Sequence, residues 1–397
     1  PILSNLLICQ SVEYSLKHGV FLESATTFAY YAIIKTRNGE YLNGKRLADV
    51  AKAIIKHYQN AKDAMDLSPA LRAEYYLYGF VDIWFTSFRE LAPKLLNCHE
   101  AAMKLGCVDD AISCLIEGWT YMLYGGDNLS IVSQSSLSCF RKIAKHSQFF
   151  AKWAVIDHVL LMDLTGKPVD IFSELEGSIH SLDDVQAKDK TDSDYDHVFT
   201  CHLQVTNLMR SFWRGDYAAA EEHFRNALSN PSLKLDFKTF IFHCFFGGLT
   251  SFCLYRTLGG CERLNSGAEM LFKIEKLAKN SETTFGNKWL LLKAEHAASV
   301  HGKCDHVEQY YNESIKAAQN HGNIHEMALA YELLGNYYAS WECGEESSNC
   351  FKRAFVYYTQ WGATKVAERI RDDHNLDMAS IANVELQARD SKHLRSW

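Results

Sequence analysis

The sequence predicts an all-α protein, an α-solenoid in which antiparallel helix pairs stack into a superhelix. Three observations predict this fold class. Apolar residues recur at helical spacing along almost the whole chain, and no convincing strand pattern interrupts them. Only 5 prolines occur in 397 residues, which leaves long windows for helices. Glycines fall between the helical segments, where helices end and turns begin.

In the N-terminal part, the apolar spacing predicts helices that are separated by turn residues. The expected helices cover 2–17, 22–37, 42–60, 69–86, 88–105, 108–124, 129–146, 149–164 and 169–182. The breaks between them carry Gly19, Asn38-Gly39, Gly106, Gly125-Gly126 and Gly166. The predicted N-terminal helical-repeat half is therefore 1–182.

The C-terminal part has the same organisation. Its expected helices cover 196–213, 217–229, 235–258, 262–280, 285–301, 305–321, 324–341, 346–361 and 363–373. They are separated at Gly215, Asn230-Pro231, Gly259-Gly260, Gly302, Gly322 and Gly344. The predicted C-terminal half is 197–374, and 375–397 is expected to be a C-terminal helix or tail.

The segment 328–361 carries the clearest repeat signal. Its first helix has Tyr331, Leu334, Gly335 and Tyr338, and its second has Ser347, Phe351 and Ala354. This is the tetratricopeptide-type order: an aromatic, Leu-Gly, an aromatic, and then small-x3-Phe-x2-Ala. The small residues let two helix backbones approach closely, and the aromatic residues fill the grooves. Because one such pair cannot bury its apolar face alone, the segment predicts a tetratricopeptide-like α-solenoid.

Three other segments echo the second-helix pattern. After Gly39 come Gly44, Ala48 and Ala51; after Gly215 come Ala220, Phe224 and Ala227; after Gly302 come Tyr311, Ser314 and Ala317–Ala318. The last, weaker copy lies about 40 residues before the clearest one, against a standard spacing of about 34, so the helices are expected to be longer. The alternative is a non-repetitive helical bundle in which the small residues coincide by chance.

The acidic segment 183–196 separates the two predicted halves. It reads DDVQAKDKTDSDYD and has almost no apolar residue with which to form a core. We expect a flexible, solvated loop. The alternative is a docking or phosphorylation segment that uses Thr191, Ser193 or Tyr195.

Composition argues against several classes of partner and compartment. A net charge of −7 gives no general attraction to nucleic acid or to anionic membranes. The most apolar run, 240–249, is short for a membrane span and contains His243, and no signal peptide is recognised at the N-terminus. The 12 cysteines include no CxxC pair, and Cys114, Cys244 and Cys253 are expected to be free, buried and small apolar residues. This usage indicates a cytoplasmic protein.

No motif of an enzyme or a cofactor site is recognised, so the chain is expected to be non-catalytic and without a cofactor. The group most like a metal site is His301, Cys304 and His306, for which only His296 could be a fourth ligand. We interpret these as ordinary turn and core residues, as we do His197, Cys201 and His202, and expect no metal. The basic residues Arg141, Lys142 and Lys145 are interpreted as a solvated helix face.

Aromatic residues in 73–85 and 118–126 form the remaining candidate site. Trp84, Trp119, Tyr121 and Tyr124 are first of all expected to be core between long helices. Where exposed, they would form an interaction surface for a peptide or a partner helix. Alternatively, Trp84, Trp119 and Tyr121 would line a pocket between repeats.

The run 325–370 resembles the helical-repeat region of large signalling ATPases and multidomain sensor kinases of bacteria and algae. The similar features are Ala330–Leu333, Tyr337-Tyr338, Ala354, Tyr357-Tyr358, Trp361–Ala363 and Lys365-Val366. Near the N-terminus, Lys17–Gly19 and Ser24–Tyr31 are also similar. Cys343-Gly344 and Thr359 depart from the usual pattern at the turn and at a position often held by proline.

The resemblance implies a regulatory segment cut from a larger signal-transducing protein, and no catalytic residue carries over. A start without methionine agrees with a fragment of a longer chain. The first functional hypothesis is a scaffold that binds protein partners or neighbouring domains of its own chain. The alternative is a module that senses a small molecule, and a third class is an unrecognised helical enzyme.

Overall fold

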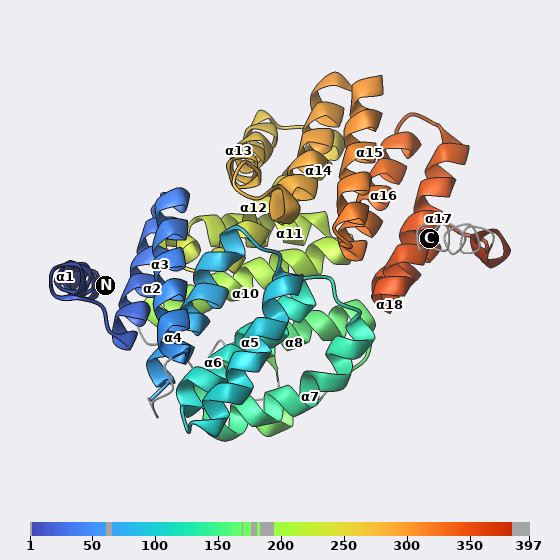
Figure 1. The fold of residues 1–397 in the computed structure, drawn as a ribbon. Coiled ribbons are helices and arrows are strands. Elements are labelled where there is room, and N and C mark those ends of the chain that lie inside the picture. Colours follow the sequence, from blue (N-terminus) through green and yellow to red (C-terminus); the bar gives the residue numbers. More distant parts are fainter. Residues whose placement is uncertain (1, 61–65, 169, 176–180, 183–193, 383–397) are drawn as a thin grey trace, which may run out of the picture. The chain divides into compact units, whose positions relative to one another are not determined.

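The computed structural model describes residues 2–60, 66–168, 170–175, 181–182 and 194–382. In these ranges the chain forms α-helices with short 3₁₀ and π turns, and no strand occurs among them (Figure 1). In the described residues of 2–124 and 194–373, helices adjacent in the sequence pack against each other. The prediction of an all-α fold is confirmed for this part of the chain.

The chain divides into two compact units, each with its own core. Unit 1 comprises 1–125, 135–154 and 174–177. Its helices are α1 (Ile2–His18), α2 (Leu22–Arg37), α3 (Tyr41–Gln59), α4 (Ser68–Tyr76), α5 (Phe88–Lys104) and α6 (Val108–Tyr124). Helices α7 (Leu129–His146) and α8 (Gln148–Thr165) contribute residues to both units.

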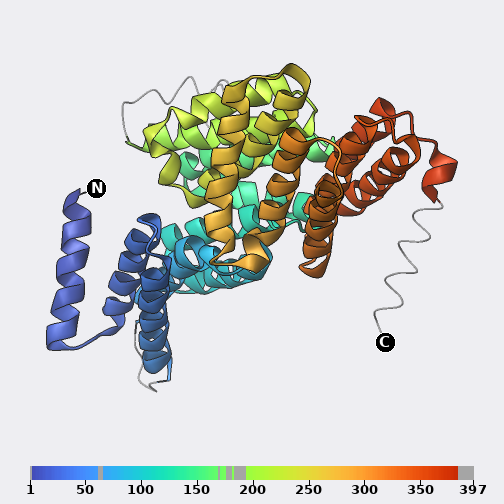
Figure 2. The same ribbon diagram turned by 90° about the horizontal axis from the view of Figure 1, so that it is seen from above.

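Unit 2 comprises 126–134, 155–173 and 178–397. Its first helices are α10 (Asp194–Trp213), α11 (Tyr217–Leu228), the 3₁₀ turn η4 (Pro231–Lys234), α12 (Phe237–Leu258) and α13 (Cys261–Ala278). They are followed by α14 (Glu282–His301), α15 (Asp305–Asn320), α16 (Ile324–Ala339), α17 (Gly344–Trp361) and α18 (Thr364–Asp373). From α12 to α18 each helix packs on the next in chain order (Figure 1 and Figure 2).

Most predicted helices agree with the structure within a few residues, but two differ. Within the predicted helix 69–86, the α-helix α4 ends at Tyr76. A π turn, η1 (Leu77–Val81), and a 3₁₀ turn, η2 (Asp82–Trp84), follow it. In η1 the Gly79 carbonyl accepts a 2.6 Å hydrogen bond from the Tyr121 hydroxyl of α6, a distant contact without a local sequence signal.

The other difference concerns 169–182, where one helix was expected. The described part contains only the 3₁₀ turn η3 (Phe172–Glu174), and residues 169 and 176–180 lie outside the described residues. The Asp170 carboxylate accepts a 3.2 Å hydrogen bond from the Ser173 N–H. Such a side-chain bond to the backbone competes with helix formation and explains the turn.

The two units do not follow the order of the chain, and 183–193 of the predicted loop 183–196 lie outside the described residues. Residues 126–134 belong to unit 2 although they are far from its helices in sequence. The Asn128 side chain donates a 2.8 Å hydrogen bond to the Gln360 carbonyl of α17. Gly362 approaches Leu129 so closely that an added Cβ would lie 3.2 Å from the Leu129 Cβ. These contacts, rather than chain order, assign 126–134 to unit 2.

The predicted pair at 328–361 is present as α16 and α17. The Ser347 hydroxyl donates a 2.9 Å hydrogen bond to the Gly335 carbonyl across the pair. A Cβ at Gly335 would lie 2.7 Å from the Phe351 ring, so only glycine permits this approach. A similar contact joins α11 to α12, where the Phe224 ring occupies the space beside Gly247.

Helix α12 corrects one expectation. By length and composition, Phe237–Leu258 is the one helix among the described residues that could cross a membrane. Within unit 2, however, 94% of that apolar stretch is buried against other helices. Its apolar character is therefore accounted for by its place in the core.

One residue of α12 is a buried histidine. Burial, with a smaller contribution from Lys273, lowers the pKa of His243 to about 3. Neither ring nitrogen has a hydrogen-bond partner in the described residues, and the ring stacks on Phe224 with centroids 4.7 Å apart. His243 is therefore a neutral part of the core.

We predict that Gly335→Ala destabilises unit 2 by about 1–3 kcal/mol, because the new methyl group overlaps the Phe351 ring. Gly344→Ala is the matched control, since a Cβ at Gly344 meets nothing within 4 Å. The control should be neutral or stabilising by up to about 1 kcal/mol. Urea unfolding of both variants measures the difference. Equal free energies of unfolding would contradict the packing of this pair.

A second prediction concerns acid stability. The unfolded chain binds a proton at His243 near pH 6.5 and the folded chain only near pH 3. Stability from this group is therefore complete above pH 6.5 and is lost as the pH falls toward 3, by at most about 1.4 kcal/mol per unit. His243→Leu should flatten the dependence of unfolding free energy on pH between about 6.5 and 4. The exposed His306, changed to Gln, should leave the slope unaltered, and a slope unchanged in both variants would refute the account.

Candidate functional site

The four aromatic residues singled out in the sequence are all buried in unit 1. The Trp84 ring lies 4.6 Å from the Tyr41 ring, and the Tyr121 ring makes an edge contact at 4.9 Å with Phe88. Trp119 and Tyr124 are buried on the same helix, α6. These residues thus belong to the core of unit 1, and the structure does not present them as an exposed interaction surface.

The metal-like groups also have ordinary surroundings. Among the described residues, no group of three or more His, Cys, Asp or Glu side chains has a geometry that could hold a metal ion. The Cys304 sulfur lies 3.6 Å from the His306 Nδ1. The buried His202 instead pairs with Asp157 at 3.2 Å and bonds the Thr239 hydroxyl at 3.1 Å.

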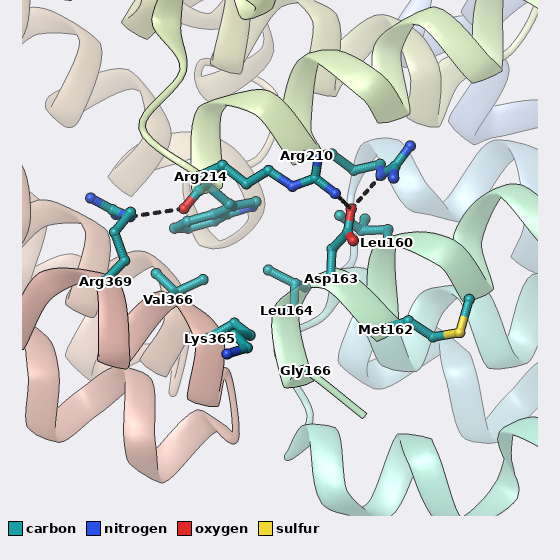
Figure 3. A pocket seen from close by; sticks show the side chains of 11 residues that line it. Leu160, Met162, Asp163, Leu164, Gly166, Arg210, Arg214, Lys365, Val366 and Arg369 are labelled. Atoms are coloured by element: carbon teal, nitrogen blue, oxygen red, sulfur yellow. Dashed lines mark hydrogen bonds and ion pairs between the residues drawn. The ribbon is translucent and has the colours of Figure 1, made fainter. Parts of the chain in front are cut away.

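A cavity lined by several charged side chains lies within unit 2 (Figure 3). Its volume is about 350 Å³, within the range of small-ligand pockets. The lining comes from the end of α8, the end of α10 and the first turns of α18. It consists of Leu160, Met162, Asp163, Leu164, Gly166, Arg210, Trp213, Arg214, Lys365, Val366 and Arg369. We call it the α18 cavity.

Two arginines share one carboxylate at this cavity. The Arg210 Nε donates at 2.5 Å and the Arg214 Nη2 at 2.7 Å to the same oxygen, Oδ2 of Asp163 (Figure 3). Arg210 is further held by the Asn207 side chain at 2.7 Å, whereas the Arg214 side chain is 56% exposed. One negative charge therefore faces two positive charges.

Arg369 anchors α18 to a buried acidic residue. Its Nη2 donates at 2.7 Å to Oε1 of Glu332 on α16, and its Nε donates at 3.0 Å to the Trp213 carbonyl of α10. The Glu332 side chain is only 3% exposed, and its other oxygen accepts a 2.7 Å hydrogen bond from the Tyr358 hydroxyl. Burial alone would lower the pKa of Arg369, but the charge of Glu332 raises it overall. The guanidinium therefore stays charged and links α10, α16 and α18.

Lys365 and an apolar wall complete the cavity. A Cβ at Gly166 would lie 2.7 Å from the Lys365 Cγ, so the glycine leaves room for the lysine stem. The Lys365 ammonium pairs at 2.8 Å with Glu368, and both side chains are exposed. Leu160, Leu164, Trp213 and Val366 are buried and form the apolar part.

A second buried acidic residue repeats the arrangement around Glu332. Glu295 on α14 binds the guanidinium of Arg256 on α12 at 2.7 Å and accepts a hydrogen bond from the Tyr311 hydroxyl on α15. In both sets a buried glutamate joins an arginine and a tyrosine from two other helices. Such a carboxylate fixes the helices around it because no water replaces a lost partner.

Sequence reasoning did not find the α18 cavity. Asp163 and Arg210 are 47 positions apart, and Glu332 and Arg369 are 37 apart. One local signal was present: Arg214 directly follows the last residue of α10, four residues after Arg210. Like charges at this spacing repel unless an anion lies between them. That spacing indicates a counter-ion from another segment, and the counter-ion is Asp163.

Another cavity, of about 440 Å³, lies in unit 1 between α1 and α2. It is lined by Leu7, Gln10, Ser11, Tyr14, Ser15, Phe21, Glu23, Ser24 and Thr27. Its lining includes hydroxyl groups, such as those of Ser15 and Ser24, but Glu23 is the one charged residue among those named. The α18 cavity is therefore the better candidate site.

Comparison with known proteins adds no relative. No protein-family model, curated protein or solved structure matches the chain.

We predict that Arg369→Leu destabilises unit 2 by about 3–5 kcal/mol, because it leaves the Glu332 carboxylate buried without its cation. The control is Arg371→Leu on the same helix, since Arg371 pairs with the exposed Asp372. That exposed pair should cost at most about 1 kcal/mol. Urea unfolding followed by circular dichroism measures both. Equal losses would show that the buried pair is not special.

Proposed function

We propose that this chain is a non-catalytic scaffold, a tetratricopeptide-like α-solenoid that binds a protein partner or a neighbouring domain of its own chain. The observation that supports it best is the recurrent close approach of helices through glycine and phenylalanine. It occurs between α16 and α17 at Gly335 and Phe351, and between α11 and α12 at Gly247 and Phe224. Repeated pairs of this kind extend by addition and create long binding faces.

The wider setting of this proposal comes from the resemblance to signalling ATPases and sensor kinases. In it, the chain is the cytoplasmic regulatory segment of a larger signal-transducing protein. The net charge of −7 favours protein over nucleic acid as the partner. The buried glutamates Glu295 and Glu332 support a rigid array, because each ties three helices together.

A second candidate function is the sensing of a small molecule, and the α18 cavity favours it. The cavity has the size of a ligand site, and charged side chains and an apolar wall meet there. It belongs to unit 2, whereas Trp84, Trp119 and Tyr121, where the sequence suggested a pocket, belong to unit 1.

Affinity capture tests the scaffold. The purified chain is immobilised in its folded form and, at equal density, after urea denaturation, and both are exposed to the same lysate. We expect the folded chain alone to retain a reproducible, small set of proteins, because a binding face exists only in the fold. If the folded chain retained nothing beyond the denatured one, the scaffold proposal would be refuted.

Thermal-shift screening with metabolites separates the second candidate. A ligand present at 100 times its Kd stabilises the folded state by about 2.7 kcal/mol and so raises the melting temperature. Partner capture without any such shift would favour the scaffold alone.

A further inference from the structure

We propose that the α18 cavity binds a small phosphate monoester with an apolar body, and that Arg214 and Lys365 contact the phosphate. The inference rests on the second candidate function and names its ligand class. It is carried by the charge of the lining, by the exposure of two of its cations and by the apolar wall beside them.

The single negative charge of Asp163 is shared by two arginines. Arg210 and Arg214 both donate to Oδ2 of this one carboxylate. Arg210 is additionally fixed by Asn207 and is mostly buried, so it is the permanent partner of Asp163. Arg214 is more than half exposed, and Asp163 is the one acidic residue with which it forms an ion pair among the described residues. One guanidinium charge is therefore left for an anion.

Helix α18 contributes two more cations, Arg369 and Lys365, to the cavity. Arg369 is paired with the buried Glu332, so its charge is already neutralised inside the protein. Lys365 pairs with Glu368, but both groups are exposed, and such a pair is worth about 1 kcal/mol or less. An incoming anion therefore displaces Glu368 from Lys365 at little cost. Arg214 and Lys365 together match the two charges of a phosphate monoester.

The lining and the volume of the cavity fit a phosphate ester better than a bare phosphate ion. A guanidinium offers a planar fork that fits phosphate oxygens, and lysine adds a point charge. Beside these cations, Leu164, Trp213 and Val366 are buried and apolar. A volume of about 350 Å³ is far more than one phosphate fills. The apolar wall accordingly fits a hydrocarbon or aromatic group attached to the phosphate.

The site is pre-formed by contacts that do not involve a ligand. Arg369 holds α18 to the end of α10 through the Trp213 carbonyl at 3.0 Å. Gly166, with a positive φ of 67°, lets the loop after α8 pass beside the stem of Lys365. The helix ends and the loop that line the cavity are therefore held in place before an anion binds.

Titration calorimetry on the full chain at pH 8 tests the proposal with phenyl phosphate, which is a dianion at that pH. Two further probes are phenyl sulfate, a monoanion of the same shape, and inorganic phosphate, which lacks the ring. We expect saturable binding of one phenyl phosphate per chain, and binding about tenfold or more weaker for each of the other probes. Equal affinities for all three, or no binding of phenyl phosphate, would overturn it.

Two variants locate the site. Arg214→Gln should weaken phenyl phosphate binding by about tenfold or more, since it removes a charged hydrogen-bond donor from the cavity. Arg225→Gln is the matched control: this arginine of unit 2 is 59% exposed, pairs with Glu221 and lies outside the cavity lining. It should leave the affinity unchanged. Equal loss in both variants would show a general charge effect and refute the site.

The outcome is separable from that of the scaffold proposal. Calorimetry needs only the purified chain, so binding of phenyl phosphate is found or not found whatever proteins the folded chain retains. If phenyl phosphate fails while a metabolite of another class shifts the melting temperature, the sensing function stands and this ligand class is wrong.

Discussion

The candidate site depends on the interactions of the buried Glu332 carboxylate. It lies inside unit 2 and holds two partners that come from different helices, the Tyr358 hydroxyl and the Arg369 guanidinium. An unpaired carboxylate at such a position would cost several kcal/mol, so both partners are needed for the chain to fold in this way. Because Arg369 also binds the Trp213 carbonyl, the same contact sets α18 against the end of α10. The pair of Glu332 and Arg369 therefore positions the helix ends that line the cavity.

Close helix packing is the second constraint on unit 2, and the residues that provide it differ from those that fix which helices meet. Glycines such as Gly335 and Gly247 admit the rings of Phe351 and Phe224, and this brings neighbouring helices together. The buried glutamates Glu295 and Glu332 then fix which helices meet, because a hydrogen-bonded charge allows one arrangement where apolar contacts allow several. The exposed cations at the α18 cavity take part in neither task. Arg214 and Lys365, which pair with Asp163 and Glu368, are the groups that we propose to bind the ligand.

The helices could be predicted from the sequence because their signals are local. Apolar spacing and glycine turns gave nearly all helix bounds in the described residues, and the order around Gly335 gave the pairing of α16 with α17. The unit division and the cavity could not be predicted, because they depend on contacts such as Asn128 with Gln360 and Asp163 with Arg210. Nor does periodicity tell a buried aromatic from an exposed one: Trp84 and Trp119 could have lined a surface, and the structure buries both.

Hydrogen exchange followed by mass spectrometry tests most directly whether Glu332 organises the site. The variant Glu332→Gln keeps the shape of the side chain and removes the charge that Arg369 binds. We predict that amide exchange accelerates together in α18 and at the end of α10, around Arg210–Arg214, while the core helix α12 keeps its protection. Acceleration confined to α16, or an unchanged pattern in all three helices, would contradict it.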